Sequence, residues 1–377
     1  MNNVIVHDII TLPLHLSNNG EDGLPKSLIL AGVTRQRISP QCQAYNLQRT
    51  NEFRALEALD PGNITHRTAQ VAEALLAPAL TEAGLEEPAA WAEVLVNAWV
   101  SNKASQDDDT GENDGEGKKA KSKKKPEDKR KDSAPLVIGE HEVRLMVGLA
   151  RAAREDGITT AEALSAALVA KPGKQPPHLK AAVALFHKAG QPQQSGLSGA
   201  LFGRMVTGVL GTTIDRCVRL MDAVTVHEAR IESDFLLASD QYAERGGSYI
   251  GTRELGGGVF YRQMAIDLDQ MVRNGVDPAT VVPELVLAYI GASPVGAKAP
   301  VANVTTLVEV GGRGVTYLPA FEEPVESSAA AARALRDFAA AAHRKVGPPK
   351  AHAWLDDLKP NPTQFDALRQ WLREQLP

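Results

Sequence analysis

Two arginines at alternating positions, Arg35 and Arg37, form the first pattern in the sequence whose chemistry points to a ligand. Side chains of a strand alternate between its two faces, so both arginines are expected on one face, roughly 7 Å apart. Ser39 followed by Pro40 predicts the start of a helix, with Ser39 as its N-cap. Two guanidinium groups beside a helix N-terminus, with its partial positive charge and free N–H donors, favour an anion with repeated charges.

The arginine pair also has a plainer explanation. Arginines on a solvated strand face commonly keep their guanidinium groups in water without a dedicated partner. Taken alone, these residues support an anion site and an ordinary solvated face equally.

A second group has the residue types of a metal site: His227, Glu228, Glu232 and Asp234. They do not all share one face at helix or strand spacing, so a metal is not expected here.

The Gly-rich segment GLSGALFGR lacks the Gly-Lys-Ser/Thr ending of a phosphate loop, which favours a packing role. We expect no catalytic residue, metal or cofactor. The enzymatic alternative is a metal-dependent RNA nuclease that uses this cluster or Asp22.

Large apolar side chains lie in a polar, Gly-flanked stretch that offers them little local core: Phe235, Leu236, Tyr249 and Ile250. One interpretation is that they hold the stretch against a sheet. The other is that they wedge between bases, as such side chains do in proteins that bind single strands. The sequence leaves both open.

The composition is that of a soluble globular protein, with 43% hydrophobic and 23% charged residues over 377 positions. Two cysteines without a CxxC spacing predict neither a disulfide framework nor a zinc site, which fits a reducing cytoplasm. We expect no signal segment and no membrane span. Because the net charge is −5, any nucleic acid is expected to bind in a local basic groove.

The first half of the chain predicts one strand followed by helices. Residues 3–12 are rich in branched apolar types, which is typical of a central strand. Helical periodicity runs from about 50 to 100 and again over 139–189. Between them, residues 103–133 form an acidic block and then a lysine-rich block without apolar residues, and we expect a disordered loop there.

The second half alternates between strands and helices. We expect strands over 200–208, 259–269 and 303–310, and helices over 213–226, 278–291, 327–345 and from Pro362. Together with the early strand, this order predicts an α+β fold, with one antiparallel or mixed sheet covered by helices.

Four motifs in this order resemble one family, the backbone subunit of type I-E Cascade, a CRISPR RNA-guided surveillance complex, often called CasC. The motifs are GVTRQRISPQ (32–41), ALFGRM (200–205), IESDFLLASD (231–240) and IGTRELGGGVFYRQMAIDL (250–268). The resemblance implies an RRM-like (ferredoxin-like) palm sheet, a helical insertion called fingers, a thumb hairpin and C-terminal helices. It implies palm over 1–54 and 196–326, fingers over 55–195, thumb over 228–257 and helices over 327–377.

The resemblance also implies a cytoplasmic, non-enzymatic protein without a membrane partner. Several copies would assemble head to tail along the CRISPR guide RNA (crRNA), whose unprotected bases pair with target DNA. Its further partners would be the large subunit, the small subunit, the crRNA 5′-end subunit and the crRNA-processing endonuclease. A self-assembling structural protein indifferent to nucleic acid is the remaining alternative.

Residue by residue, the resemblance implies RNA contacts by Lys26, Arg35, Arg37, Ser39, Gln41, Arg49, Arg204, Met205 and Lys298. It implies base wedging by Phe235, Leu236, Tyr249 and Ile250. The chain departs from the family after Gln41. The family usually continues Ser-Gln-Ser-Leu-Lys-Arg, whereas this chain has no basic residue before Arg49, and Tyr45 is expected to stack or pack instead.

Overall fold

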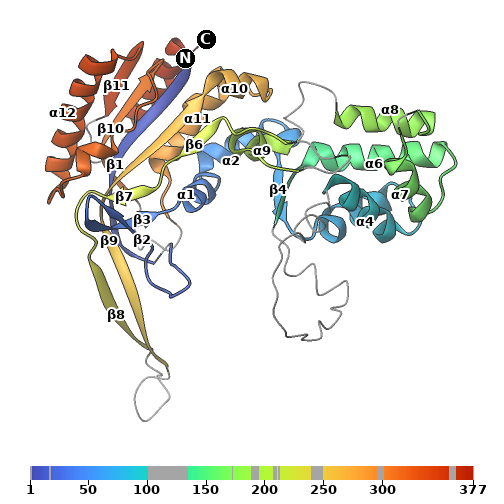
Figure 1. Ribbon diagram of the computed structural model, residues 1–377, viewed down its shortest axis with the longest axis horizontal. Coiled ribbons are helices and arrows are strands. Elements are labelled where there is room, and N and C mark those ends of the chain that lie inside the picture. Colours follow the sequence, from blue (N-terminus) through green and yellow to red (C-terminus); the bar gives the residue numbers. More distant parts are fainter. Residues whose placement is uncertain are drawn as a thin grey trace, which may run out of the picture. The chain divides into compact units, whose positions relative to one another are not determined.

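The computed structural model describes residues 2–16, 18–100, 135–171, 173–187, 195–206, 210, 213–238, 249–294, 301–355 and 362–376. Side chains at 236–238, 249–250 and 362–363 lie outside this description. The chain divides into two compact units (Figure 1). Unit 1 comprises residues 1–56, 218–272 and 277–377, and unit 2 comprises 57–217 and 273–276. Within the described residues, none of the helices has the length and apolar character that crossing a membrane requires.

Unit 1 is built on an antiparallel sheet with the strand order β11-β10-β1-β9-β7-β3-β2. Its strands are β1 (Asn3–His15), β2 (Ser27–Leu30), β3 (Val33–Ile38), β7 (Ala223–Thr225), β9 (Tyr249–Asp267), β10 (Ala302–Val310) and β11 (Ala351–Leu355). Two further strands, β6 (Val218–Leu220) and β8 (Ile231–Ala238), also pair with β9. The predicted α+β class is confirmed.

Helices cover both faces of the sheet, as the apolar sequence of β1 requires. Ile9 points into a core shared with η5 (Leu318–Phe321) and α12 (Ser328–Val346). Its neighbour Ile10 points to the opposite face, beneath α1 (Pro40–Leu47) and α11 (Pro278–Gly291). The C-terminal helix α13 (Pro362–Gln375) packs on α11, where Arg369 pairs with Glu284 at 2.8 Å.

A buried ion pair joins the central strands to α11. Asp8 of β1 accepts hydrogen bonds from Arg262 Nε of β9 at 2.8 Å and from the Thr306 hydroxyl of β10 at 2.7 Å. Arg262 also donates to the carbonyl oxygens of Ile290 (2.9 Å) and Ala292 (3.1 Å) at the end of α11. Because both charges are paired and hydrogen-bonded, their burial is compatible with a stable core.

A second buried carboxylate fastens α12 to the sheet. Glu309 of β10 accepts hydrogen bonds from Tyr317 (2.9 Å), and its Oε1 lies 2.6 Å from His343 Nε2 of α12. Burial raises the pKa of Glu309, but the nearby His7 ring and the hydrogen bonds with His343 and Tyr317 outweigh burial and bring the pKa to about 2. The carboxylate therefore stays ionised at neutral pH.

The strand β9 is longer than the sheet that it belongs to. Residues 258–267 pair with β1, whereas 249–256 pair with β8 as a two-stranded hairpin that extends from the sheet (Figure 1). The main-chain N–H of Ala229 donates to the Thr34 carbonyl at 2.8 Å, which ties the start of the hairpin to β3.

Unit 2 is a helical assembly around a small two-stranded sheet of β4 (Thr65–Thr68) and β5 (Leu136–Gly139). Its helices are η1 (Pro61–Asn63), η2 (Val71–Leu76), α3 (Ala77–Glu82), α4 (Pro88–Trp99), α6 (Glu140–Glu155), α7 (Ala161–Val169), α8 (Pro177–Phe186) and α9 (Gly196–Phe202). Trp91, Trp99 and Met146 are fully buried in its apolar core. Unit 2 continues to Cys217, beyond residue 195 where the sequence placed the end of the insertion.

Two element predictions are wrong. The first residues of the expected strand over 200–208 belong to α9, which ends at Phe202. Gly203 caps this helix with a φ of +75°. The expected helix over 213–226 contains the strands β6 and β7, because both pair with β9. The predicted strands over 259–269 and 303–310 and the helix over 278–291 are confirmed.

We expect Asp8→Ala to destabilise unit 1 by about 3–5 kcal/mol, because it leaves the buried Arg262 guanidinium without its counter-charge. The double variant Asp8→Ala, Arg262→Met should lose less than the sum of the two single variants, because no unpaired charge remains. Urea unfolding measures all three. Additive losses would show that the two side chains are not coupled.

We expect acidification to weaken unit 1 through Glu309. The folded-state pKa of about 2 lies below the ordinary value of 4.5, so the unfolded state binds the proton first. This stabilisation by Glu309 is complete above pH 4.5 and disappears as the pH falls towards 2. It is worth at most about 3 kcal/mol, because part of the shift comes from His7, whose own pKa is lowered by burial. Glu309→Gln should therefore be less stable than the unaltered chain at neutral pH and converge with it near pH 2 in urea unfolding. A constant difference across this range would contradict the assignment.

Candidate nucleic-acid interface

The junction of β3 and α1 has the local structure that its sequence predicts. Ser39 adopts an extended conformation, and its hydroxyl accepts a hydrogen bond from the Cys42 N–H at 3.4 Å, with Pro40 in the first turn. The Ser39 N–H donates to Asn18 Oδ1 at 2.8 Å, which fixes the junction from the other side. Ser39 is buried in this capping role.

Arg35 does not stand at the surface, so the prediction of an exposed arginine pair is wrong. Its side chain is 0% exposed, and its guanidinium donates to the main-chain carbonyl oxygens of Thr225 (3.3 Å), Phe321 (3.0 Å) and Glu322 (3.2 Å). The end of η5 thus covers the face of β3 that the alternating pattern had assigned to solvent. Burial lowers the pKa of Arg35 from its ordinary value.

Arg37 remains partly exposed on β3. Its guanidinium lies 3.5 Å from an Asp222 carboxylate oxygen, and each side chain is about one-third exposed. Exposed ion pairs of this kind are weak, so Arg37 can exchange its partner for another anion at small cost.

The outer side of α1 carries further candidates from the sequence. Gln41 and Arg49 are exposed and Lys26 is half-buried. The Lys26 N–H donates to the Asn18 carbonyl at 2.9 Å, and the Asn18 side chain accepts from the Ser39 N–H, so Lys26 lies beside the start of α1. We call Lys26, Gln41, Tyr45 and Arg49 the α1 surface. The structure therefore brings Lys26, Gln41 and Arg49 to α1 or its ends, whereas Arg37 lies on the face of β3 that Arg35 occupies, opposite Ile38 and α1.

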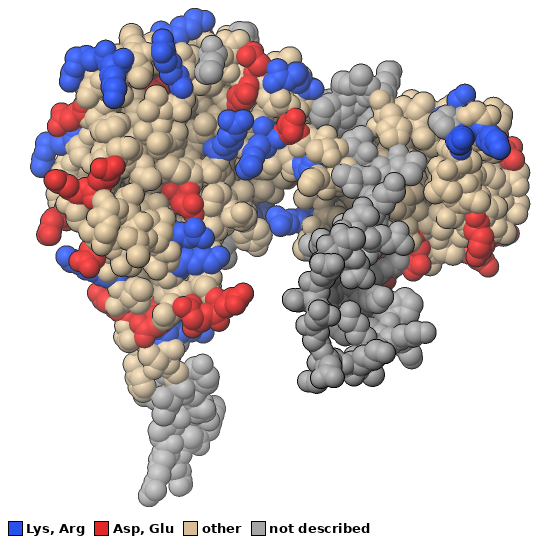
Figure 2. All heavy atoms as spheres, in the orientation of Figure 1, with Lys and Arg blue, Asp and Glu red and all other residues tan. Residues whose placement is uncertain are grey.

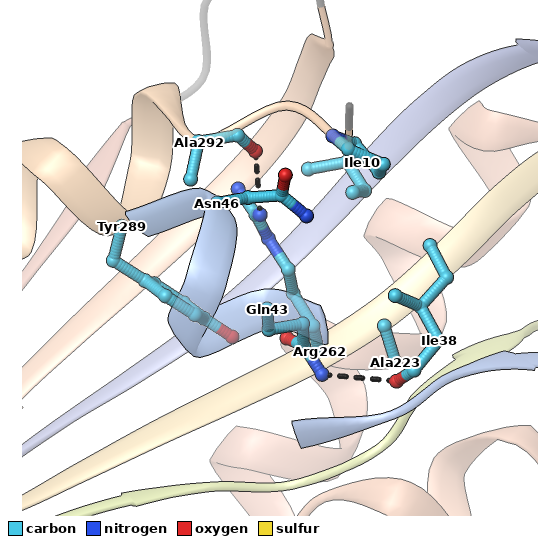
Figure 3. Close-up of a pocket in the computed structure, with 9 residues that line it drawn as sticks. Ile10, Ile38, Gln43, Asn46, Ala223, Arg262, Tyr289 and Ala292 are labelled. Atoms are coloured by element: carbon cyan, nitrogen blue, oxygen red, sulfur yellow. Dashed lines mark hydrogen bonds between the residues drawn. The ribbon is translucent and has the colours of Figure 1, made fainter. Parts of the chain in front are cut away.

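A recess of about 310 Å³, which includes space open to solvent, lies beneath α1 and α11 (Figure 3). Gln43 and Asn46 of α1, Arg262 of β9 and Tyr289 of α11 lie along it. The Arg262 guanidinium is committed to Asp8 and two carbonyl oxygens, and burial raises the pKa of Tyr289. The positive charge of Arg262 in this recess is therefore used in contacts within the fold.

Arg204 has an internal role in unit 2 rather than the surface position predicted for an RNA contact. Its guanidinium forms a buried ion pair with Glu142 of α6 and lies 5.1 Å from the centroid of the Trp99 ring. Its neighbour Met205 is 77% exposed. Lys298 lies outside the described residues.

The hairpin of β8 and β9 exposes apolar and acidic side chains together. Phe235 is 63% exposed and Ile231 is 40% exposed. Figure 2 shows acidic side chains gathered where the hairpin leaves the sheet, with basic ones among them. The sequence there supplies four acidic residues, Glu228, Glu232, Asp234 and Glu254, and two exposed arginines, Arg230 and Arg253. The start of the hairpin is therefore mixed in charge, with a small acidic excess.

Three other wedge candidates, Leu236, Tyr249 and Ile250, lie in the paired strands. Their side chains fall outside the described part of the structure.

His227 sits where the hairpin joins the sheet, and both of its ring nitrogens face main-chain atoms. Nε2 accepts from the Val259 N–H at 3.0 Å, and Nδ1 lies 2.7 Å from the Glu228 carbonyl oxygen. Asp22 accepts a hydrogen bond from the Leu24 N–H within its own turn. Among the described residues, no three His, Cys, Asp or Glu side chains form a group suited to a metal ion.

Gly258 allows the His227 ring to reach its place. Its φ is +130°, and a Cβ added there would lie 2.1 Å from His227 Nε2. Only glycine fits both the conformation and the contact.

We expect Gly258→Ala to lower stability by about 1–3 kcal/mol and to loosen the hairpin, because the methyl group displaces His227 from the Val259 N–H. Thermal unfolding and limited proteolysis within 231–256 measure the two effects. Gly291→Ala is the matched control, because the added Cβ would meet nothing within 4 Å. Equal behaviour of the two variants would contradict this role for Gly258.

The fold has relatives among solved structures. A chain of a structure described as a CRISPR RNA-guided surveillance complex, pre-nicking, matches with a TM-score of 0.70 and 22% identity, covering 98% of this chain and 100% of that chain. A chain of a second CRISPR RNA-guided surveillance complex matches with a TM-score of 0.62 and 20% identity, covering 98% and 99%. At these identities the likeness shows a shared fold over the whole length.

Sequence comparison gives the family. No curated protein matches the chain. The model of one protein family, described as CT1975-like protein, matches residues 4–369. Because this match spans nearly the whole sequence, the chain belongs to the CT1975-like protein family.

Proposed function

We propose that this chain is a non-enzymatic crRNA-binding backbone subunit of a CRISPR surveillance complex of the type I-E Cascade kind. The observation that carries the proposal is the whole-length structural match to chains of CRISPR RNA-guided surveillance complexes, at 98% coverage of this chain. The motifs that resemble the Cascade backbone family support it, as does membership in the CT1975-like family.

The structure supports a division of roles in such a subunit. Lys26, Arg37 and Arg49 would bind the phosphates of the guide, because they are the sequence candidates of unit 1 that keep exposed or half-exposed charges. The β8–β9 hairpin would act as the thumb, with Phe235 displacing bases at intervals. Unit 2 would be the fingers. Copies would assemble head to tail, and the exposed guide would pair with target DNA.

Buried arginines would serve the fold in this proposal. Arg35 and Arg204 each use their guanidinium groups on carbonyl or carboxylate oxygens inside their own unit. A charge reversal at Arg35 would therefore report on folding before it reports on RNA.

We expect the triple variant Lys26→Gln, Arg37→Gln, Arg49→Gln to lose copurified guide RNA when expressed with a CRISPR array. For single-stranded RNA, the slope of log K against log salt should fall by about 2, at about 0.7 for each phosphate contact removed. The control is Arg344→Gln, Lys345→Gln, which removes two exposed cations from the last turn of α12, on the face of the sheet away from α1.

The same preparation tests the enzymatic alternative. The proposed scaffold should bind labelled RNA without cutting it in Mg²⁺ or Mn²⁺. An unaltered chain that copurifies without RNA at low salt, or one that cleaves RNA, would contradict the proposed function.

A further inference from the structure

The outer side of α1 presents an aromatic ring to solvent beside a cation. Tyr45 is 54% exposed, although its ring is large and mostly apolar. Arg49 follows Tyr45 by four residues, just after the end of α1. Its guanidinium carbon is 5.2 Å from the centroid of the Tyr45 ring, and its NH1 donates to the Tyr45 hydroxyl at 3.0 Å. The two side chains thus form one ordered, exposed group.

The inner side of α1 prevents the ring from turning into the core. Gln43 Nε2 donates to the carbonyl oxygens of Ile38 (3.1 Å) and Met221 (2.6 Å), and Asn46 Nδ2 donates to the Cys42 carbonyl at 2.7 Å. Both amides are more than nine-tenths buried. The Asn46 bond lies within α1, but the Gln43 bonds reach carbonyl groups outside the helix and therefore fix its rotation, so position 45 faces outward.

The surroundings of the ring are basic. Residues 26–54 contain five basic residues and a single acidic one, but Arg35 is buried and Arg37 lies on the face of β3 turned away from α1. The Lys26 N–H donates to the Asn18 carbonyl, and the Asn18 side chain accepts from Ser39 at the start of α1, so Lys26 lies beside the helix. Gln41 is exposed one turn before Tyr45. A ligand that matches this surface carries repeated negative charge and a flat ring, which is the chemistry of a single-stranded nucleic acid.

We propose that Tyr45 and Arg49 form a stacking platform for one nucleobase of single-stranded RNA. Arg49 lies over the Tyr45 ring and orients it, so the exposed part of the ring is available for a base. The adjacent cations, Lys26 and Arg49, bind the flanking phosphates. The platform rests on the proposed function and adds a base contact on α1, where the chain has no basic residue between Arg37 and Arg49.

The test measures binding of the full-length chain to a fluorescein-labelled single-stranded RNA and to an abasic strand of the same length. Tyr45→Ala should weaken binding to the RNA by about 5- to 150-fold, which corresponds to about 1–3 kcal/mol of base–aromatic stacking. The slope of log K against log salt should stay unchanged, because the lost ring is neutral. With the abasic strand, Tyr45→Ala and the unaltered chain should bind equally.

Two further variants distinguish the contribution of the Tyr45 ring to RNA binding from that of Arg49. Tyr45→Phe keeps the ring and should bind RNA within about twofold of the unaltered chain, since stacking needs only the π-face. Arg49→Gln should instead lower the salt slope by about 0.7. All of these positions are exposed, and circular dichroism checks that each variant is folded.

The outcomes distinguish this inference from the proposed function. If the unaltered chain binds no RNA, the proposed function fails and the platform fails with it. If RNA binds but Tyr45→Ala is neutral, or Tyr45→Phe loses as much as Tyr45→Ala, only the platform is overturned. Weaker self-association of Tyr45→Ala with unchanged RNA affinity would assign the ring to a protein interface and also overturn it.

Discussion

The buried contact between Asp8 and Arg262 is the constraint on which unit 1 depends. It joins β1 to β9 and the end of α11 at one buried point. A slip of β9 by one residue would move Arg262 to the other face of the sheet and leave two buried charges unpaired. The register of β9 is therefore fixed. Because the same strand continues into the hairpin, the place where the hairpin leaves the sheet is fixed with it.

Burial of arginine recurs in both units and limits the charge that reaches the surface. Arg35, Arg204 and Arg262 each donate to main-chain carbonyl oxygens, and two of them also pair with carboxylates. Arginine suits this use because its planar group offers five N–H donors in fixed directions. A count of basic residues in the motifs therefore overstates the charge available to a polyanion. The remaining surface cations are few, and repetition of the subunit along an RNA would multiply their effect.

The sequence predicted elements whose signals are local. Ser39-Pro40 predicted the start of α1, where Ser39 is the cap. The helices predicted over 278–291 and 327–345 are α11 and α12, whose caps are Asp277 and Ser327. Residues 213–226 carry apolar spacings compatible with a helix or a strand, and only the pairing with β9 decides between them. Likewise, alternation places Arg35 on one face of β3 but does not reveal that η5 covers that face.

The candidate site shows the same division between local and long-range information. The exposure of Tyr45 follows from the buried Gln43 amide on the inner side of α1, whose partners are the carbonyl oxygens of Ile38 and Met221. The first is a near neighbour in sequence, whereas the second is 178 residues away. The spacing of Tyr45 and Arg49 was visible as an i, i+4 pair, but a sequence does not show whether such a pair faces water or protein.

The chemistry of these surfaces suits a guide of any sequence. Phosphate contacts carry no base identity, and stacking on a ring or displacement by an apolar side chain accepts every base. The hairpin offers an apolar contact, because the exposed Phe235 can meet a base or a neighbouring subunit without reading its identity. Under the proposed function, the protein would hold the backbone at α1 and touch bases at few points, so that base pairing alone reads the target.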